Sequence, residues 1–137
     1  MNALHRALLP AYFQDAGRQL EAMERALDLL ARDPADRNAR ATVQRAAHTL
    51  KGNSGVMGFV TLVAVSGAVE DAMRPAADAA PRLPEGALSI LRRAAATLRA
   101  LVACVDIEDL PTPDATLIPE LAALASRARP LSKECRS

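Results

Sequence analysis

The sequence predicts an all-α protein, an antiparallel four-helix bundle with room for a short fifth helix near the C-terminus. Apolar residues recur at steps of three and four over four long stretches, as a buried helix face requires. No second strand is available for a first one to pair with. Half of the residues are hydrophobic but only 2% are aromatic. The core must therefore be built from Leu, Val, Ala and Met, a composition that favours packed helices.

The first helix is predicted from Pro10 to Ala31. Its apolar residues alternate steps of four and three: Leu9, Phe13, Ala16, Leu20, Met23, Leu27 and Leu30. Pro10 suits the first turn of a helix, where a missing N–H leaves no hydrogen bond unmade. Residues 2–9 would then form a separate short turn of helix before it.

The second helix is predicted to begin between Pro34 and Asn38, where an aspartate and a proline interrupt the apolar pattern, and to end near Asn53. Residues 55–58, which include two glycines, would form the turn that follows. The buried face of this helix is narrow and carries mostly small side chains: Ala39, Val43, Ala46, Ala47 and Leu50.

The third helix is predicted over residues 59–74, although its valines favour a strand by propensity alone. The apolar repeat at three and four decides for a helix: Phe59, Leu62, Val65, Val69 and Met73. Residues 75–84, rich in Pro, Ala and Asp, are predicted to form a loop. The fourth helix is predicted from about Pro84, with one apolar face: Leu88, Leu91, Ala95, Leu98, Val102 and Val105.

Residues 1–108 are expected to form the bundle, and residues 109–137 a proline-rich tail. Four prolines exclude one continuous helix in the tail: Pro111, Pro113, Pro119 and Pro130. A short helix that lies on the bundle is compatible with the apolar residues between them: Ile118, Leu121, Leu124, Ala125 and Ala128.

Composition argues against several classes of protein. A formal net charge of +1 without a long basic run predicts no general attraction to nucleic acid or membranes. Cys104 and Cys135 have no neighbouring His or Cys at metal-ligand spacing, so neither a disulfide framework nor a metal site is expected. No run approaches 18 apolar residues, and no basic segment followed by an apolar one opens the chain. We expect a soluble, cytoplasmic protein.

His48 is the residue around which the chemistry is expected. At about 100° per residue, it points away from the apolar face of the second helix and should be exposed. Five residues fall within about 60° of it: Gln44, Arg45, Lys51, Gly52 and Gly55. Lys51 is the cation beside the imidazole, and the other four residues form the expected docking surface. Glycine inside a helix costs about 1 kcal/mol relative to alanine. The bare backbone at Gly52 therefore indicates close approach of another molecule.

The run Ala47-His48-Thr49-Leu50-Lys51-Gly52, followed by Ser54-Gly55 and Gly58-Phe59, closely resembles the phosphoacceptor motif of histidine phosphotransfer (HPt) domains. Its spacing is similar to the N-terminal phosphotransfer domain of chemotaxis histidine kinases. The resemblance implies a helical bundle in which Nε2 of His48 accepts a phosphoryl group. It also implies the partners: a histidine kinase, and a response-regulator receiver domain whose aspartate exchanges the group with His48.

The two residues expected to support His48 are Lys51 and Glu70. An imidazole is largely neutral at pH 7 and keeps a free nitrogen lone pair. Lys51 is a point cation suited to phosphate oxygens, and the resemblance implies that it assists the phosphorylated histidine. Glu70, at the edge of the apolar face of the third helix, is placed to accept a hydrogen bond from Nδ1–H of His48. The chain departs from chemotaxis kinases at Ser66-Gly67, where they often carry Thr-His, so the second histidine of their hydrogen-bond network is absent here.

No ATP site is visible, since the chain has neither a glycine-rich phosphate loop nor an acidic metal cluster. A phosphocarrier rather than an enzyme is expected, with no cofactor of its own and with Mg²⁺ only through the partner receiver domain. The alternative is a helical adaptor that binds receiver domains without phosphotransfer. A bundle metalloenzyme would need clustered carboxylates and a second inward histidine. The sequence leaves open whether the chain stands alone or is a fragment of a histidine kinase.

The other polar residues suggest no chemistry. His5 has no charged partner at helical spacing. Arg92, Arg93 and Arg99 are expected to be solvated side chains.

Overall fold

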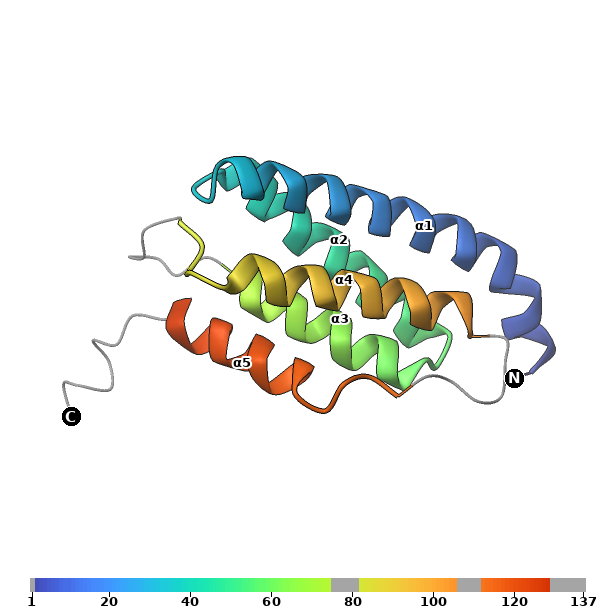
Figure 1. Ribbon diagram of the computed structural model, residues 1–137. Helices are drawn as coiled ribbons and strands as arrows, with labels where there is room; N and C mark the ends of the chain where they lie inside the picture. Colours follow the sequence, from blue (N-terminus) through green and yellow to red (C-terminus); the bar gives the residue numbers. More distant parts are fainter. Residues whose placement is uncertain (1, 75–81, 106–111, 129–137) are drawn as a thin grey trace, which may run out of the picture.

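The computed structural model describes residues 2–74, 82–105 and 112–128, and within these ranges the chain is helical without a strand (Figure 1). The helices are α1 (Ala3–Arg32), α2 (Arg37–Val56), α3 (Val60–Met73), α4 (Ala87–Ala103) and α5 (Leu117–Ala128). Each of the first four helices packs against two others in a closed ring, α1 on α2 and α4, and α3 on α2 and α4. Helices next to one another in this ring run antiparallel (Figure 1). The predicted four-helix bundle is confirmed.

The core is aliphatic, with Tyr12 and Phe59 as its buried aromatic residues. Their rings meet edge to face with centroids 5.1 Å apart. The hydroxyl of Tyr12 lies 2.8 Å from Oγ of Ser54, and burial raises the pKa of that phenol. The contacts of Tyr12 with Ser54 and Phe59 join α1 to the last turn of α2 and to the residue that precedes α3. They fix one end of the bundle.

The start of α1 differs from the prediction. The helix begins at Ala3, so the predicted separate turn over residues 2–9 and the helix start at Pro10 are wrong. Asn2 caps the helix, because its Oδ1 accepts a hydrogen bond from the backbone N–H of His5 at 2.8 Å. Pro10 lies inside α1 and is exposed. Its ring therefore removes one backbone donor but displaces no packed neighbour.

The second helix begins at Arg37, within the predicted window, with Asp36 as its cap. It ends at Val56, three residues beyond the predicted end, so Gly55 is helical and its assignment to the turn is wrong. Met57 and Gly58 form a turn as predicted, and the φ of +76° at Gly58 favours glycine. Because the left-handed position comes at Gly58, nothing stops the helix at Gly55.

The third helix is confirmed, with Val60–Met73 differing from the predicted ends by one residue each. Its predicted apolar face is buried throughout, so the periodicity outweighs the strand propensity of the valines. The fourth helix begins at Ala87, three residues after the predicted start, because Pro84 and Glu85 lead into a turn. Part of the predicted loop, residues 75–81, lies outside the described residues.

The short fifth helix is present as α5, which packs on α3 and α4. Leu117, Leu121 and Leu124 belong to the same core as the longer helices. Ile118, expected on the buried face, is 39% exposed, and Leu117 is buried in its place. The predicted boundary between residues 108 and 109 lies outside the described residues, as does Cys135.

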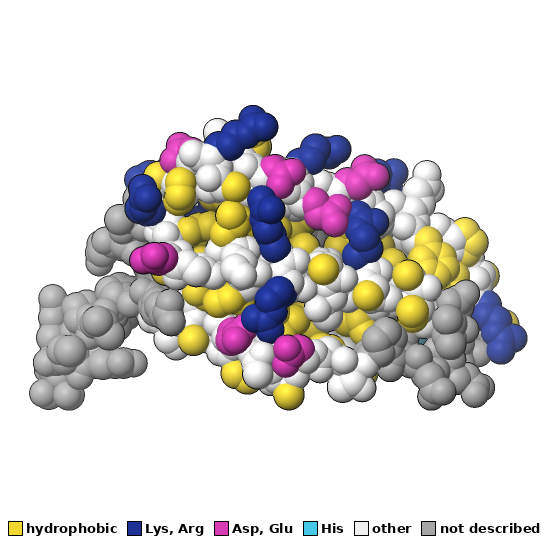
Figure 2. All heavy atoms as spheres, viewed as in Figure 1, with side chains coloured by type: hydrophobic (Ala, Val, Ile, Leu, Met, Phe, Trp, Pro, Cys, Tyr) yellow, Lys and Arg dark blue, Asp and Glu magenta, His cyan; other side chains and the backbone are white. Residues whose placement is uncertain are grey.

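The arginines of α4 face solvent, as expected, but they also form ion pairs that the sequence did not predict. Arg92 pairs with Asp28 at 3.1 Å and Arg99 with Glu24 at 2.6 Å, which links α4 to α1. Arg93 reaches the start of α5 through Glu120, Thr116 and Asp114. Figure 2 shows acidic and basic side chains interspersed over this face. Exposed ion pairs contribute at most about 1 kcal/mol each to stability. They therefore orient the helices, and the buried core stabilises the bundle.

Replacing Leu121 with Ala should show that α5 belongs to the core. Leu121 is 0% exposed, and truncating such a leucine lowers the free energy of unfolding by about 2–5 kcal/mol. Ile118→Ala, on the exposed side of the same helix, should lower it by less than about 1 kcal/mol. Urea unfolding monitored by circular dichroism measures both. Equal effects would contradict the packing of α5.

Candidate functional site

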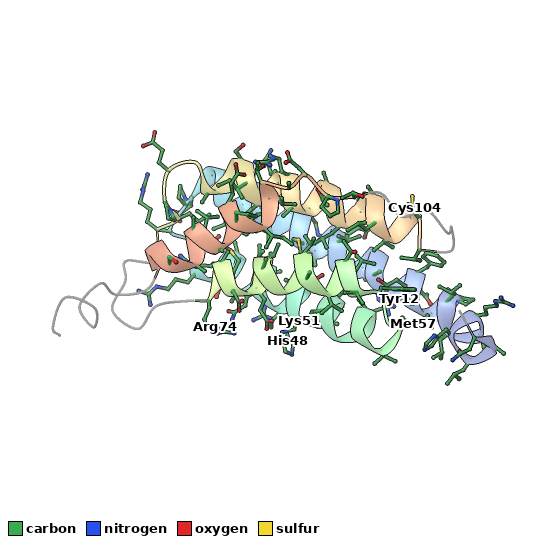
Figure 3. The ribbon with its side chains drawn as sticks, turned by 90° about the horizontal axis from the view of Figure 1, so that it is seen from below. Tyr12, His48, Lys51, Met57, Arg74 and Cys104 are labelled. Carbon is green, nitrogen blue, oxygen red and sulfur yellow. The ribbon has the colours of Figure 1, made fainter. Side chains whose placement is uncertain are left out.

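Three polar side chains from two helices meet at the surface between α2 and α3. Nδ1 of His48 lies 2.5 Å from Oε2 of Glu70, and Nζ of Lys51 lies 2.5 Å from Oε1 of the same carboxylate. Figure 3 shows His48 and Lys51 side by side on this surface, with Arg74 toward one end and Met57 toward the other. We refer to His48, Lys51 and Glu70 as the carboxylate cluster.

Packing of the two helices places the cluster. Ala47 and Leu50 are fully buried, which turns the side chains of His48 and Lys51 outward. Glu70 follows the buried Val69 and points toward α2. Nearby, Nε of the buried Arg40 donates to the backbone carbonyl of Met73 at 3.2 Å. This bond ties α2 to the last turn of α3.

The three side chains differ sharply in exposure, with 8% for Glu70, 36% for Lys51 and 66% for His48. Burial by itself raises the pKa of the Glu70 carboxyl, but hydrogen bonds from Lys51 and His48 and their positive charges outweigh burial. The pKa of Glu70 is therefore lower than usual. The carboxylate is ionised at neutral pH and can only accept hydrogen bonds.

This acceptor determines which ring nitrogen of His48 carries hydrogen. Because Glu70 can only accept, Nδ1 must be the donor. In the neutral ring, the lone pair then lies on Nε2. The exposed imidazole thus presents an unprotonated nitrogen, which is the form that acts as a nucleophile.

The sequence predicted much of this arrangement. The exposure of His48 and its hydrogen bond to Glu70 are confirmed. Lys51 differs from the expected mobile cation, since its ammonium is bonded to Glu70. Helical spacing placed Lys51 beside His48 but could not show that one carboxylate holds both.

The residues of the expected docking surface lie around His48 on α2. Arg45 is exposed and donates weakly to Thr42 at 3.4 Å. Gly52 and Gly55 are exposed, and a Cβ added at Gly52 would meet nothing within 4 Å. Packing within the protein therefore does not require glycine at position 52. Gln44 is half-buried. Binding of a partner here stays a prediction.

Two apolar residues at the end of α2 and the start of α3 are exposed, which the sequence analysis missed. Val56 is 69% exposed at the end of α2, and Val60 is 78% exposed at the start of α3. The prediction placed Val56 in a turn, so it did not show that α2 continues to this residue.

Neither a cluster of metal ligands nor a membrane-spanning helix is present in the described ranges. No group of three His, Cys, Asp or Glu residues there could hold a metal ion. Among the same residues, no helix has both the length and the apolar character needed to cross a membrane.

A helical bundle with an exposed imidazole that is held by a carboxylate and lies beside a cation defines a class of domain that can carry a phosphoryl group on histidine. The family model described as Hpt domain matches residues 7–129, so the chain belongs to the Hpt domain family. Members of this family are phosphocarriers in two-component systems.

One similar protein is Chemotaxis protein CheA of Treponema pallidum (strain Nichols), which is 35% identical over 71 residues. The match covers 52% of this chain but only 9% of the relative. The chain thus corresponds to a small part of that protein. No solved structure matches the chain.

Ionised Glu70 should make stability depend on pH. Its folded pKa lies below the ordinary value of 4.5, so its contribution is complete above that value and is lost as pH falls through the lower folded pKa. Wild type should exceed Glu70→Gln in unfolding free energy by about 1 kcal/mol at pH 7. The difference should shrink as the pH falls below 4.5.

Urea titrations of both proteins at pH 7, 5 and 3 measure this difference. A gap of the same size at all three pH values would contradict an ionised, hydrogen-bonded Glu70.

Proposed function

We propose that this chain accepts a phosphoryl group on Nε2 of His48 and exchanges it with an aspartate of a response-regulator receiver domain. The observation that carries the proposal is the hydrogen bond from Nδ1 of His48 to Glu70, which leaves Nε2 free on the exposed side. The Nε2 lone pair would attack phosphorus while the bond from phosphorus to the aspartyl oxygen breaks. The products are a phosphoramidate and a free carboxylate, and the reverse reaction returns the group.

Glu70 has an electrostatic role in this proposal. As Nε2 donates its lone pair, positive charge develops on the ring, and the carboxylate 2.5 Å from Nδ1 stabilises that charge. Lys51 lies in the same cluster, where an ammonium can meet phosphate oxygens. Both roles require the ring to stay hydrogen-bonded while the partner docks.

The proposed partners are a histidine kinase and a receiver domain, which dock over His48 on the surface of Gln44, Arg45, Gly52 and Gly55. The chain needs no ATP site or cofactor of its own, since Mg²⁺ would arrive with the receiver domain. The similarity to Chemotaxis protein CheA supports a chemotaxis pathway in the cytoplasm. Both a stand-alone carrier and a domain of a larger kinase fit the proposal.

Replacing His48 with Gln should abolish phosphate uptake and keep the fold. Gln can occupy the exposed position and form hydrogen bonds, but it cannot become a phosphoramidate. With ³²P-labelled kinase or receiver domain, wild type should take up acid-labile, base-stable label, and His48→Gln should take up none. His5→Gln, in the first turn of α1, is the matched control and should behave as wild type.

Equal uptake by wild type and His48→Gln, or label that maps to His5, would refute the phosphocarrier. If His48→Gln and wild type bind a receiver domain equally and neither takes up label, the protein is an adaptor that binds receiver domains without phosphotransfer.

Replacing Gly52 with Gln should test the docking surface. The added side chain meets nothing within the protein but projects from the surface beside His48. We expect an unchanged melting temperature or a slight rise, because the helix gains propensity, and receiver binding at least about tenfold weaker, a loss of 1.4 kcal/mol. Gly17→Gln, at an equally open position in α1, is the control for both measurements. Equal binding by the two variants would argue against docking at Gly52.

A further inference from the structure

Gly67 occupies an unusual position in the middle of α3. Its φ is not positive, so the backbone conformation there does not call for glycine. Glycine in a helix interior nevertheless costs about 1 kcal/mol relative to alanine. A Cβ at this position would lie 3.4 Å from Cδ of Lys51. The space beside Gly67 is therefore bounded by the side chain of Lys51.

The stem of Lys51 crosses α3 at this point to reach Glu70. Lys51 belongs to α2, its Cδ lies over Gly67, and its Nζ bonds to Oε1 of Glu70, almost one turn farther along α3. The bare backbone of Gly67 thus lies beneath the path that brings the ammonium to the carboxylate. A side chain with γ atoms at position 67 would compete for the space that the stem occupies.

We propose that Gly67 is a positioning residue, whose missing side chain lets Lys51 lie across α3 and share the Glu70 carboxylate with His48. Oε1 of Glu70 then accepts from the lysine and Oε2 from the imidazole. Because the ammonium offsets part of the carboxylate charge, Gly67 also governs how strongly Glu70 acts on the ring. This inference deepens the proposed function, on which its meaning for phosphotransfer rests.

The chain itself provides a direct assay, because it contains two lysines, Lys51 and Lys133. An ammonium paired with a carboxylate reacts more slowly with an amine-acylating reagent than a free one, since only the uncharged amine is nucleophilic. The rate at which acetic anhydride labels Lys51, divided by the rate for Lys133 in the same molecule, reports on the Lys51–Glu70 pair. Mass spectrometry of the digested protein gives both rates.

Gly67→Val is the test variant, because a β-branched side chain in a helix is restricted at χ1 and cannot easily turn both γ carbons away. We expect the Lys51 to Lys133 ratio to rise about threefold or more, as for the loss of a partly exposed ion pair. Gly67→Ala should leave the ratio unchanged, because its Cβ reaches only contact distance. Glu70→Gln should raise the ratio without any change at position 67.

Gly17→Val is the matched control, since position 17 in α1 has nothing within 4 Å of an added Cβ. A ratio in Gly67→Val equal to that of wild type, or an equal rise in Gly17→Val, would overturn the inference. If Gly67→Val does not fold, Gly67→Thr has the same branching and a polar side chain, and the same outcomes decide. The labelling ratio is measured without phosphate. It can therefore contradict the role of Gly67 while His48 still takes up label, and it can support that role in a protein that takes up no label.

Discussion

The buried carboxylate of Glu70 is the constraint on which the site depends. A charge with so little exposure needs hydrogen-bonding partners, and His48 and Lys51 supply one to each oxygen. Both partners come from α2, so α2 and α3 must keep one register. The bond from Arg40 to Met73 holds that register near the cluster, and the contacts of Tyr12 with Ser54 and Phe59 hold it at the other end.

The bundle supports His48 indirectly, because it holds α3, the helix that carries Glu70, in place. α3 packs against α2, α4 and α5, so Glu70 projects from an element that is supported on three sides. His48 itself is largely exposed, and its ring is oriented by a hydrogen bond rather than by packing. A domain of the Hpt family can therefore present an accessible imidazole and still fix the orientation of the ring.

Much of the arrangement could be predicted because it follows from helical periodicity. The angular position of His48 relative to the apolar face of its helix predicted its exposure, and that of Glu70 placed the carboxylate at the edge of α3, within reach of an adjacent helix. The resemblance to the phosphotransfer domain of chemotaxis kinases then indicated His48 as the partner of Glu70. Features that depend on how helices meet could not be predicted in this way. The hydrogen bond of Lys51 to Glu70 and the ion pairs of Arg92 and Arg99 join residues whose separation periodicity does not determine. Pro10 lies inside α1 because Asn2 caps the helix earlier in the chain, and the apolar periodicity does not indicate that cap.

The central claim is that Glu70 holds hydrogen on Nδ1 of His48 and leaves Nε2 free. The ¹⁵N chemical shifts of the ring nitrogens, measured by NMR at a pH where His48 is neutral, test it most directly. We expect Nδ1 to show the shift of a protonated nitrogen and Nε2 that of an unprotonated one, with the preference weakened in Glu70→Ala. A ring that carries its hydrogen mainly on Nε2 in the wild-type protein would contradict the claim.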